Sequence, residues 1–135
     1  MPDLEAPKPR PVVLIADDKQ SNRELLRAIL ENANYIVVEA ADGEEALLLA
    51  SESNPHLVIL DIHMPKRDGF GVITELRKDP MLQGVPIMAL TASASFNEKD
   101  RILGSGFDAC FVKPIGPAKL RDAVASLLQQ SASIG

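Results

Sequence analysis

The chain has 135 residues, of which 46% are hydrophobic and 24% charged, proportions that are ordinary for one globular domain and exclude wholesale disorder. Its formal net charge of −5 at pH 7 argues against a general nucleic-acid-binding surface, which would be basic. A single cysteine, Cys110, excludes an internal disulfide, and no apolar run is long enough for a membrane-spanning helix. The N-terminus carries no apolar signal segment, so we expect a cytoplasmic location, with flexible tails at residues 1–10 and 131–135.

The first third of the chain alternates short apolar runs with an amphipathic segment. Residues 12–16 (VVLIA) and 35–40 (YIVVEA) are rich in β-branched side chains, which favours strands. Between them residues 21–33 predict a helix, with Ser21 as its N-cap and Glu24 at the capping-box spacing. The apolar face of this helix is predicted to consist of Leu26, Ile29, Leu30 and Ala33.

The same alternation continues to the end of the chain. Further strands are expected at residues 56–60, 86–91 and 108–112. Further helices are expected at 42–53, where Asp42 is the cap, and at 68–79, 97–106 and 117–128. Five strand–helix units are too few for an eight-stranded barrel. They predict an open α/β fold, a doubly wound (βα)5 parallel sheet of flavodoxin-like strand order 2-1-3-4-5.

Polar side chains follow four of the five predicted strands. Asp17 and Asp18 follow the first strand and Asp61 the third, while Thr91 and Lys113 lie at the ends of the fourth and fifth. In sheets of this kind ligands bind beyond the carboxyl ends of the strands, where the strand order reverses between strands 1 and 3. The carboxylates should therefore crowd together in one pocket.

Such crowding requires positive charge. Two like charges ~4 Å apart repel by about 4 kcal/mol at an effective dielectric constant of about 20, and Lys113 supplies only one cation. Mg²⁺ prefers oxygen ligands and keeps places for water or phosphate oxygens, so we expect Mg²⁺ here. A carboxylate such as Asp61 can then act as a nucleophile that forms an aspartyl-phosphate, with the hydroxyl and ammonium groups stabilising the transferred oxygens.

Four sequence motifs carry a resemblance to a known family. They are "ADD", "ILDIHMPKRDGFG", "ALTA" and "FVKPI", in this order along the chain. Each is weak by itself, but together on a (βα)5 frame they are specific. The chain resembles the CheY-like receiver domain of two-component response regulators over residues 11–130.

The resemblance implies a phosphotransfer site. Asp61 would be the phospho-acceptor, receiving its phosphoryl group from the phosphohistidine of a sensor kinase or a histidine phosphotransfer protein. Asp18 and Asp61 would bind Mg²⁺ directly, together with the backbone carbonyl of His63. Asp17 would act through a metal-bound water.

The same resemblance implies roles for residues around the phosphoryl group. Thr91 and Lys113 would each contact a phosphoryl oxygen, and the peptide bond to Pro114 would be cis. His63 and Ser93 stand two residues after Asp61 and Thr91, at places that tune dephosphorylation in this family.

One position departs from the family pattern. An aromatic residue usually stands three residues before the lysine, as a switch coupled to the threonine, and here that position holds Cys110. By itself Cys110 reads as a small buried hydrophobic residue. Phe111 should point to the opposite face of the sheet and cannot replace the switch. Leu25, just off the apolar stripe of its helix, is a candidate for kinase docking, as that helix face docks the kinase in this family.

The function expected is a single-domain signalling module rather than a turnover enzyme. Its partners would be the kinase or phosphotransfer protein and an unknown downstream protein, with no direct nucleic-acid or membrane binding, and it would be a monomer or weak dimer. A receiver fragment of a longer regulator or hybrid kinase would look the same. A Mg²⁺-dependent phosphatase of the haloacid-dehalogenase type would need a second Asp where His63 stands, and a flavin-binding protein would need a Ser/Thr/Gly-rich loop where "DDKQSN" stands.

Overall fold

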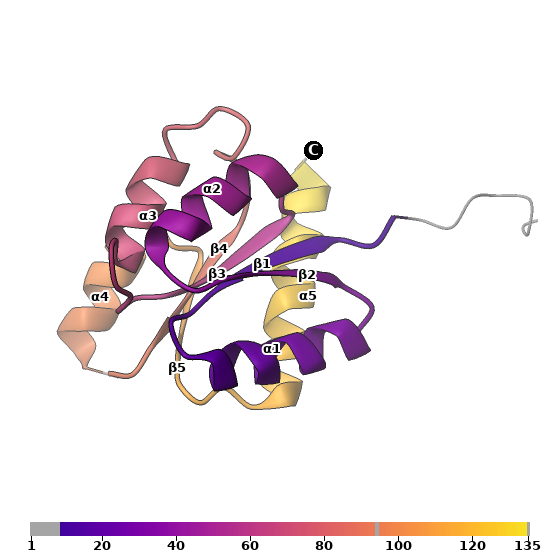
Figure 1. Cartoon of the computed structure of the whole chain (residues 1–135), viewed down its shortest axis with the longest axis horizontal. Helices are drawn as coiled ribbons and strands as arrows, with labels where there is room; N and C mark the ends of the chain where they lie inside the picture. The colour runs from indigo at the N-terminus through magenta and orange to yellow at the C-terminus, as the bar shows by residue number, and fades with distance from the viewer. Residues whose placement is uncertain (1–8, 94, 135) are drawn as a thin grey trace, which may run out of the picture.

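The structure, a computed structural model, describes residues 9–93 and 95–134. It contains a five-stranded parallel sheet in the order β2-β1-β3-β4-β5, which confirms the predicted fold (Figure 1). The strands are β1 (Val12–Ala16), β2 (Ile36–Ala40), β3 (Leu57–Asp61), β4 (Ile87–Thr91) and β5 (Ala109–Val112). The helices are α1 (Gln20–Asn32), α2 (Gly43–Ser53), α3 (Gly69–Leu76), α4 (Phe96–Gly104) and α5 (Pro117–Ile134).

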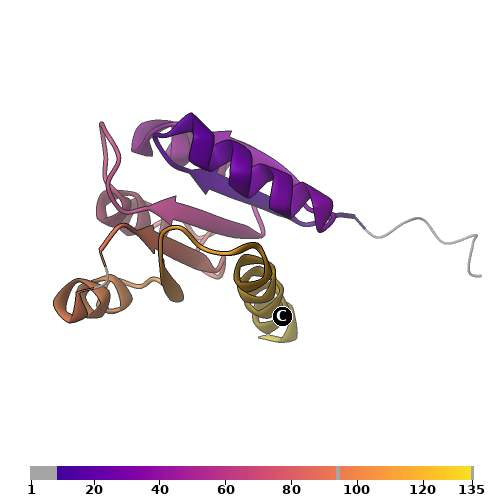
Figure 2. The ribbon, with the colours of Figure 1, turned by 90° about the horizontal axis from the view of Figure 1, so that it is seen from below.

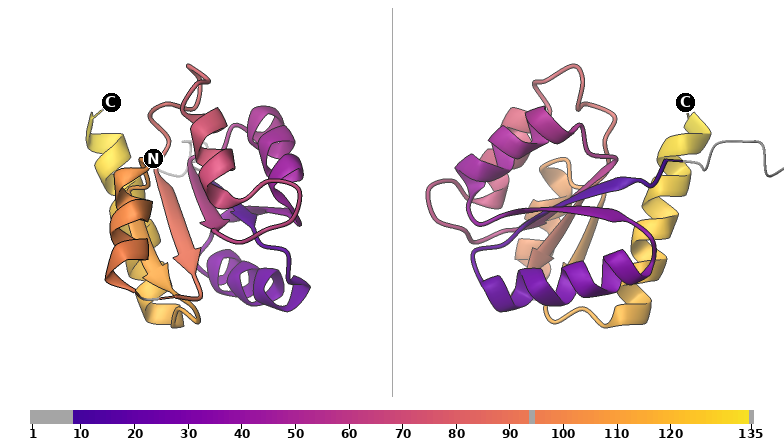
Figure 3. Two further views of the ribbon diagram at one scale, coloured as in Figure 1. Left: turned by 90° about the vertical axis from the view of Figure 1, so that its left-hand side faces the viewer. Right: turned by 45° about the vertical axis from the view of Figure 1, so that its right-hand side comes forward.

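Helices cover both faces of the sheet, so alternate side chains of each central strand enter different cores. On one face Val13 and Ile15 pack with α1 and α5, which lie on the same side of the sheet in Figures 2 and 3. On the other face Leu14 packs with α2, α3 and α4. Every residue of β3 and β4 is buried, which explains why these strands read as continuous apolar runs ending in a polar residue.

Helix α1 begins earlier than the capping pattern predicts. Its N-cap is Lys19 and its first residue is Gln20, so the assignment of Ser21 as the N-cap is wrong. The reason is that Asp17 Oδ1 accepts the backbone N–H of Lys19 at 2.9 Å and turns the chain into the helix sooner. Glu24 also does not complete a capping box, because its Oε1 accepts the side-chain amide of Gln20 at 2.9 Å.

Helix α3 ends three residues before the predicted boundary of 79. The backbone N–H groups of Lys78 and Asp79 donate to Glu75 and Leu76 at 3.1 and 3.2 Å, three residues back rather than four. This tighter turn ends the α-helix before the following proline. The start was predicted well, since Asp68 is the N-cap and its carboxylate accepts the N–H of Gly71 at 2.9 Å.

Helix α5 is longer than predicted. It runs to Ile134, so residues 131–134, which were assigned to a C-terminal tail, continue the helix. No proline or glycine stands in residues 129–134 to end it. The N-terminal tail expected at 1–10 falls mostly on residues 1–8, which lie outside the described residues. Other boundaries differ by one or two residues, the usual uncertainty of helix and strand ends.

The loop after β3 is held against the first turn of α2. A Cβ atom added at Gly43 would lie 1.9 Å from the carbonyl oxygen of Arg67, so the close approach requires glycine. Asp42 caps α2 as predicted, accepting the N–H of Glu45 at 2.8 Å, while Glu45 Oε1 accepts the N–H of Ala41 at 2.7 Å. The chain leaving Asp61 is thereby fixed over the end of the sheet.

Candidate functional site

Strand register brings the predicted site residues together. Ala16 of β1 pairs with Leu60 of β3, so the residues that follow them, Asp17 and Asp61, are neighbours at the carboxyl edge of the sheet. Asp61 in turn pairs with Leu90, the residue before Thr91. One ligand atom each of Asp17, Asp18 and Asp61 lies within 4.8 Å of the others. The predicted crowding of carboxylates is confirmed.

Lys113 lies between two of these carboxylates. Its Nζ is 3.0 Å from Asp17 Oδ2 and 3.0 Å from Asp61 Oδ2. Burial opposes the charge of Lys113, but the hydrogen bonds with Asp17 and Asp61 outweigh it, and the pKa of Lys113 is raised. For Asp61 burial dominates, and it raises the pKa of this carboxyl despite the hydrogen bond with Lys113. Lys113 therefore stays protonated, and its single positive charge does not balance the three carboxylates of the site.

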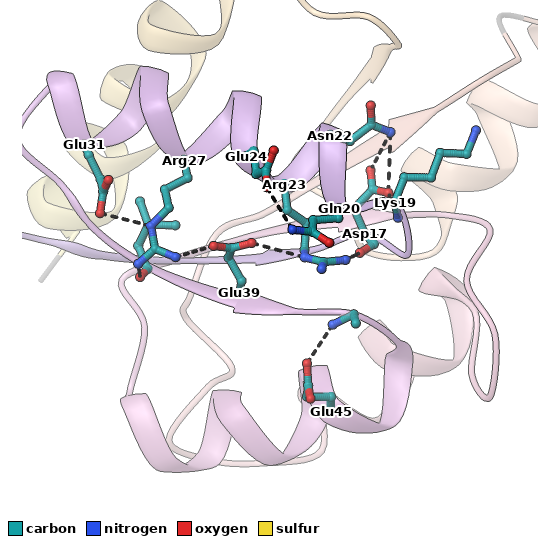
Figure 4. A network of polar contacts seen from close by, with 12 residues as sticks. Asp17, Lys19, Gln20, Asn22, Arg23, Glu24, Arg27, Glu31, Glu39 and Glu45 are labelled. Carbon is teal, nitrogen blue, oxygen red and sulfur yellow. Dashed lines mark hydrogen bonds and ion pairs between the residues drawn. The ribbon is translucent and has the colours of Figure 1, made fainter.

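Asp17 is the most heavily bonded of the three carboxylates. Besides Lys113 and the N–H of Lys19, it accepts the side-chain amide of Asn22 at 3.3 and 3.5 Å (Figure 4). Arg23 donates to the backbone carbonyl of Asp17 at 2.8 Å. These contacts hold a carboxylate that is only 1% exposed in a single orientation. By contrast Asp18 is exposed, and no hydrogen bond or ion pair to another described residue engages it.

Arg23 also belongs to an ion-pair network that ties α1 to the edge strand. Its Nε donates to Glu39 of β2 at 3.1 Å, and Arg27 donates to the other oxygen of Glu39 (Figure 4). Arg27 is paired with Glu31 at 3.1 Å as well. The network fixes α1 against β2, and because Asn22 lies in the first turn of α1, it also helps to hold Asn22 against Asp17.

Thr91 is buried at the end of β4, on the side of β3 opposite to β1, and its hydroxyl makes two hydrogen bonds. Thr91 Oγ1 donates to Glu98 Oε1 at 3.0 Å and accepts the backbone N–H of Ser93 at 3.2 Å. The His63 ring stands at the rim, 71% exposed, with Nε2 3.6 Å from the same Glu98 oxygen. The backbone N–H of His63 donates to Asp61 Oδ1 at 3.3 Å.

The peptide bond between Lys113 and Pro114 is cis, as predicted. A cavity of about 280 Å³ opens beside these residues, between the start of α1 and the loop after β5. Its lining includes Asp17, Asn22, Leu25 and Lys113. Leu25 is 52% exposed, in agreement with its predicted place beside the apolar stripe.

Cys110 and Phe111 lie on opposite faces of the sheet, as strand alternation predicts. Cys110 is half-buried and packs against the core that contains α4, while Phe111 packs against the core of α1 and α5. Burial raises the pKa of the Cys110 thiol. This residue therefore behaves as a small hydrophobic side chain of the sheet.

Two residues of the site were missed by the analysis of the sequence. Asn22 stands five residues after Asp17 on the first turn of α1, and the strand–loop–helix spacing could have indicated it. Glu98 lies seven residues after Thr91, in the first turn of α4, and no local pattern marks it.

The match to a family model agrees with this geometry. Residues 13–125 match the model of the response regulator receiver domain. The chain belongs to the response regulator receiver family. Receiver domains are signalling modules of two-component systems, and this decides in favour of the receiver over the phosphatase and flavin-binding alternatives.

Similar proteins point the same way. The chain is 44% identical over 119 residues to a probable transcriptional regulator ycf27 of Guillardia theta, covering 88% of this chain and 46% of that protein. It thus spans about half the length of the curated relatives that it matches. Among solved structures, the chemotaxis response regulator CheY4 of Vibrio cholerae is 31% identical with a TM-score of 0.83, covering 88% of this chain and 99% of that chain.

A second similar structure contains magnesium. The receiver domain of the sensor histidine kinase PA1611 from Pseudomonas aeruginosa PAO1 has a magnesium ion coordinated in its active site cleft. It is 26% identical to this chain, with a TM-score of 0.83 and coverage of 90% of this chain and 99% of that chain.

Within the described part of this protein, no helix is both long and apolar enough to cross a membrane.

Proposed function

We propose that this receiver accepts a phosphoryl group on Asp61 in a Mg²⁺-dependent reaction and signals by changing how it binds a partner protein. The observation that supports this most directly is the grouping of three carboxylates with ligand atoms within 4.8 Å of one another, two of which pair with one lysine. Asp61 is 5% exposed and lies at the end of a fully buried strand, where a charged side chain costs free energy.

The donor set suits Mg²⁺. All candidate ligand atoms are oxygens, and a single ammonium leaves the three carboxylates in excess. Asp18 is exposed and unengaged by described residues, and it would bind the ion directly, together with Asp61 and the backbone carbonyl of His63. The hydrogen bonds that occupy Asp17 suit a contact through water. When bound, Mg²⁺ would neutralise the carboxylates and draw charge from the phosphoryl oxygens.

The chain's own residues then perform the transfer. An oxygen of Asp61 forms a bond to phosphorus as the nitrogen–phosphorus bond of a donor phosphohistidine breaks, and the released imidazole takes a proton from water. Lys113 is already 3.0 Å from Asp61 and can follow one phosphoryl oxygen. Thr91 is the hydroxyl for another, while His63 and Ser93 would govern the access of water during dephosphorylation.

The donor would be a sensor histidine kinase or a histidine phosphotransfer protein, and the downstream target another protein. The cavity beside Asp17 and Lys113 is bordered by Leu25, whose exposed apolar side chain supports a docking role for this rim. We also propose that the protein is a monomer or weak dimer and binds neither nucleic acid nor membranes directly.

Intact mass spectrometry with acetyl phosphate tests the proposal. The wild-type protein should gain one phosphoryl group in the presence of Mg²⁺ and none after chelation, and Asp61→Ala should gain none. Asp100→Ala, an exposed carboxylate on α4, is the matched control and should react like the wild type. A wild type that takes no adduct from acetyl phosphate and shows no Mg²⁺ binding by calorimetry would overturn the phosphotransfer function.

A further inference from the structure

The hydroxyl of Thr91 has one proton, and in this structure that proton is directed to Glu98 rather than toward Asp61. The distance from Thr91 Oγ1 to Glu98 Oε1 is 3.0 Å. The second contact of the hydroxyl is from the N–H of Ser93 at 3.2 Å, where Thr91 accepts. A hydroxyl has a single donor, so Thr91 cannot donate to Glu98 and to a phosphoryl oxygen at once.

Glu98 is well placed to hold this bond in the resting protein. It lies in the first turn of α4, where its backbone N–H is fixed by the side chain of the N-cap Ser95 at 3.2 Å. Its side chain is 25% exposed and is directed inward, between Thr91 and the ring of His63. The carboxylate therefore bridges the rim of the site and the start of the helix.

A phosphoryl group on Asp61 would compete with Glu98 in two ways. Its oxygens are strong acceptors for the same Thr91 proton, and its negative charge opposes that of a carboxylate nearby. Both effects act to separate Glu98 from Thr91. Because Glu98 is part of α4, its release changes what holds the first turn of that helix.

We propose, on the basis of the phosphotransfer function above, that Glu98 is a positioning residue that holds Thr91 in the unphosphorylated receiver and couples its release to α4. The site is thereby coupled to α4 in a protein that has Cys110, and no aromatic side chain, at the switch position of β5. Cys110 packs against the core that α4 joins through Ile102, but on β5 it stands opposite Ala89 and not Thr91, so the hydrogen bond from Thr91 to Glu98 is the more direct link.

Binding of beryllofluoride, an analogue of the phosphoryl group, tests the proposal when followed with Mg²⁺ by NMR of ¹⁵N-labelled protein. Loss of the competing acceptor in Glu98→Ala should tighten beryllofluoride binding by about fivefold, the equilibrium effect of one hydrogen bond. Glu98→Gln keeps an oxygen acceptor without the charge and should fall between wild type and Glu98→Ala. Asp100→Ala removes an equal charge from the exposed side of the same helix and should bind like the wild type.

Two further measurements separate this coupling from a general charge effect. With Thr91→Ala as the background, Glu98→Ala and Glu98→Gln should bind beryllofluoride equally, because only the charge difference from wild type remains. The amide signals of α4 should shift less on binding in Glu98→Ala than in wild type, while those of α3 shift alike. Glu98→Ala binding within twofold of Asp100→Ala, with normal binding by wild type, would overturn the role of Glu98 and leave phosphotransfer standing. Failure of wild type to bind beryllofluoride with Mg²⁺ would overturn both.

Discussion

Polar side chains gather at both ends of this sheet, but their charges are arranged differently. At the amino ends of β4 and β5, Arg77 donates to Asp108 at 3.0 Å and to the backbone carbonyls of Gln83, Val85 and Gly106 at 3.0, 2.8 and 3.1 Å. Asp108 also accepts the N–H of Ile87 at 2.8 Å. One positive and one negative charge are paired, and both side chains also form hydrogen bonds with backbone groups around them.

At the carboxyl ends the balance is missing. Asp17, Asp18 and Asp61 lie together, but Lys113 pairs only with Asp17 and Asp61, and burial raises the pKa of Asp61. A cluster that only stabilised the fold would resemble the one around Arg77, because unpaired buried charge costs free energy. The difference supports the proposed binding of a cation and the proposed phosphotransfer at the carboxyl-end cluster, while the paired charges of the amino-end cluster stabilise the fold.

The largest effect on folding should come from breaking the balanced cluster. Arg77→Ala removes the ion pair of Asp108, which keeps only the N–H of Ile87, and takes the Arg77 donor from three carbonyls, so we expect the free energy of unfolding to fall by about 2–3 kcal/mol. Urea unfolding followed by circular dichroism measures it. The neighbouring Lys78→Ala is the control, since its 68% exposed side chain makes a surface pair worth less than about 1 kcal/mol. Equal stability of the two variants would contradict the assignment.

The second effect concerns the metal at the unbalanced cluster. Calorimetry suits this titration, because the chain has no tryptophan to report binding. Asp18→Asn should weaken Mg²⁺ affinity by about tenfold or more, or ~1.4 kcal/mol, since it removes a charged oxygen ligand. Lys78→Ala should bind as the wild type does. Unchanged affinity in Asp18→Asn would show that the ion, if bound, does not use this carboxylate.

A third change should have the opposite sign from Arg77→Ala. In the absence of divalent ions, Asp61→Asn relieves repulsion within the cluster and should raise the free energy of unfolding by about 1 kcal/mol, the smaller end of the interaction between like charges ~4 Å apart. Chemical denaturation in a chelating buffer measures it. A loss of stability similar to that of Arg77→Ala would mean that Asp61 has a structural role after all.

The smallest effect is the pH dependence of that gain. The folded protein binds the Asp61 proton more tightly than the unfolded chain does, because burial raises the pKa of this carboxyl. Stability contributed by Asp61 therefore falls as pH rises from its ordinary pKa of ~3.9 through the raised value, and then stays low. The advantage of Asp61→Asn should vanish at acidic pH and level off above this window. An advantage that grew toward acid would have the wrong sign for a raised pKa.

Much of this architecture could be predicted because it depends on near neighbours in the chain. The β-branched runs, the caps at Asp42 and Asp68, and the aspartates that end two apolar strands all act within a few residues. Once the strand order is known, parallel register places the strand ends along one edge. The position of Lys113 beside Asp17, 96 residues away, follows from that order and not from any local signal.

What the sequence by itself determined is the (βα)5 frame, the acidic edge with its lysine and threonine, and the split of Cys110 and Phe111 between two faces. Tertiary structure alone decided which groups share each proton. Asp17 accepts hydrogen bonds from Asn22 and from the N–H of Lys19, and the bond from Lys19 starts α1 earlier than the sequence predicts. Glu98 accepts the hydrogen bond of the Thr91 hydroxyl. The physical reason is range: periodicity and capping act within a helical turn or a strand, whereas a hydrogen bond of about 3 Å depends on how separate elements pack.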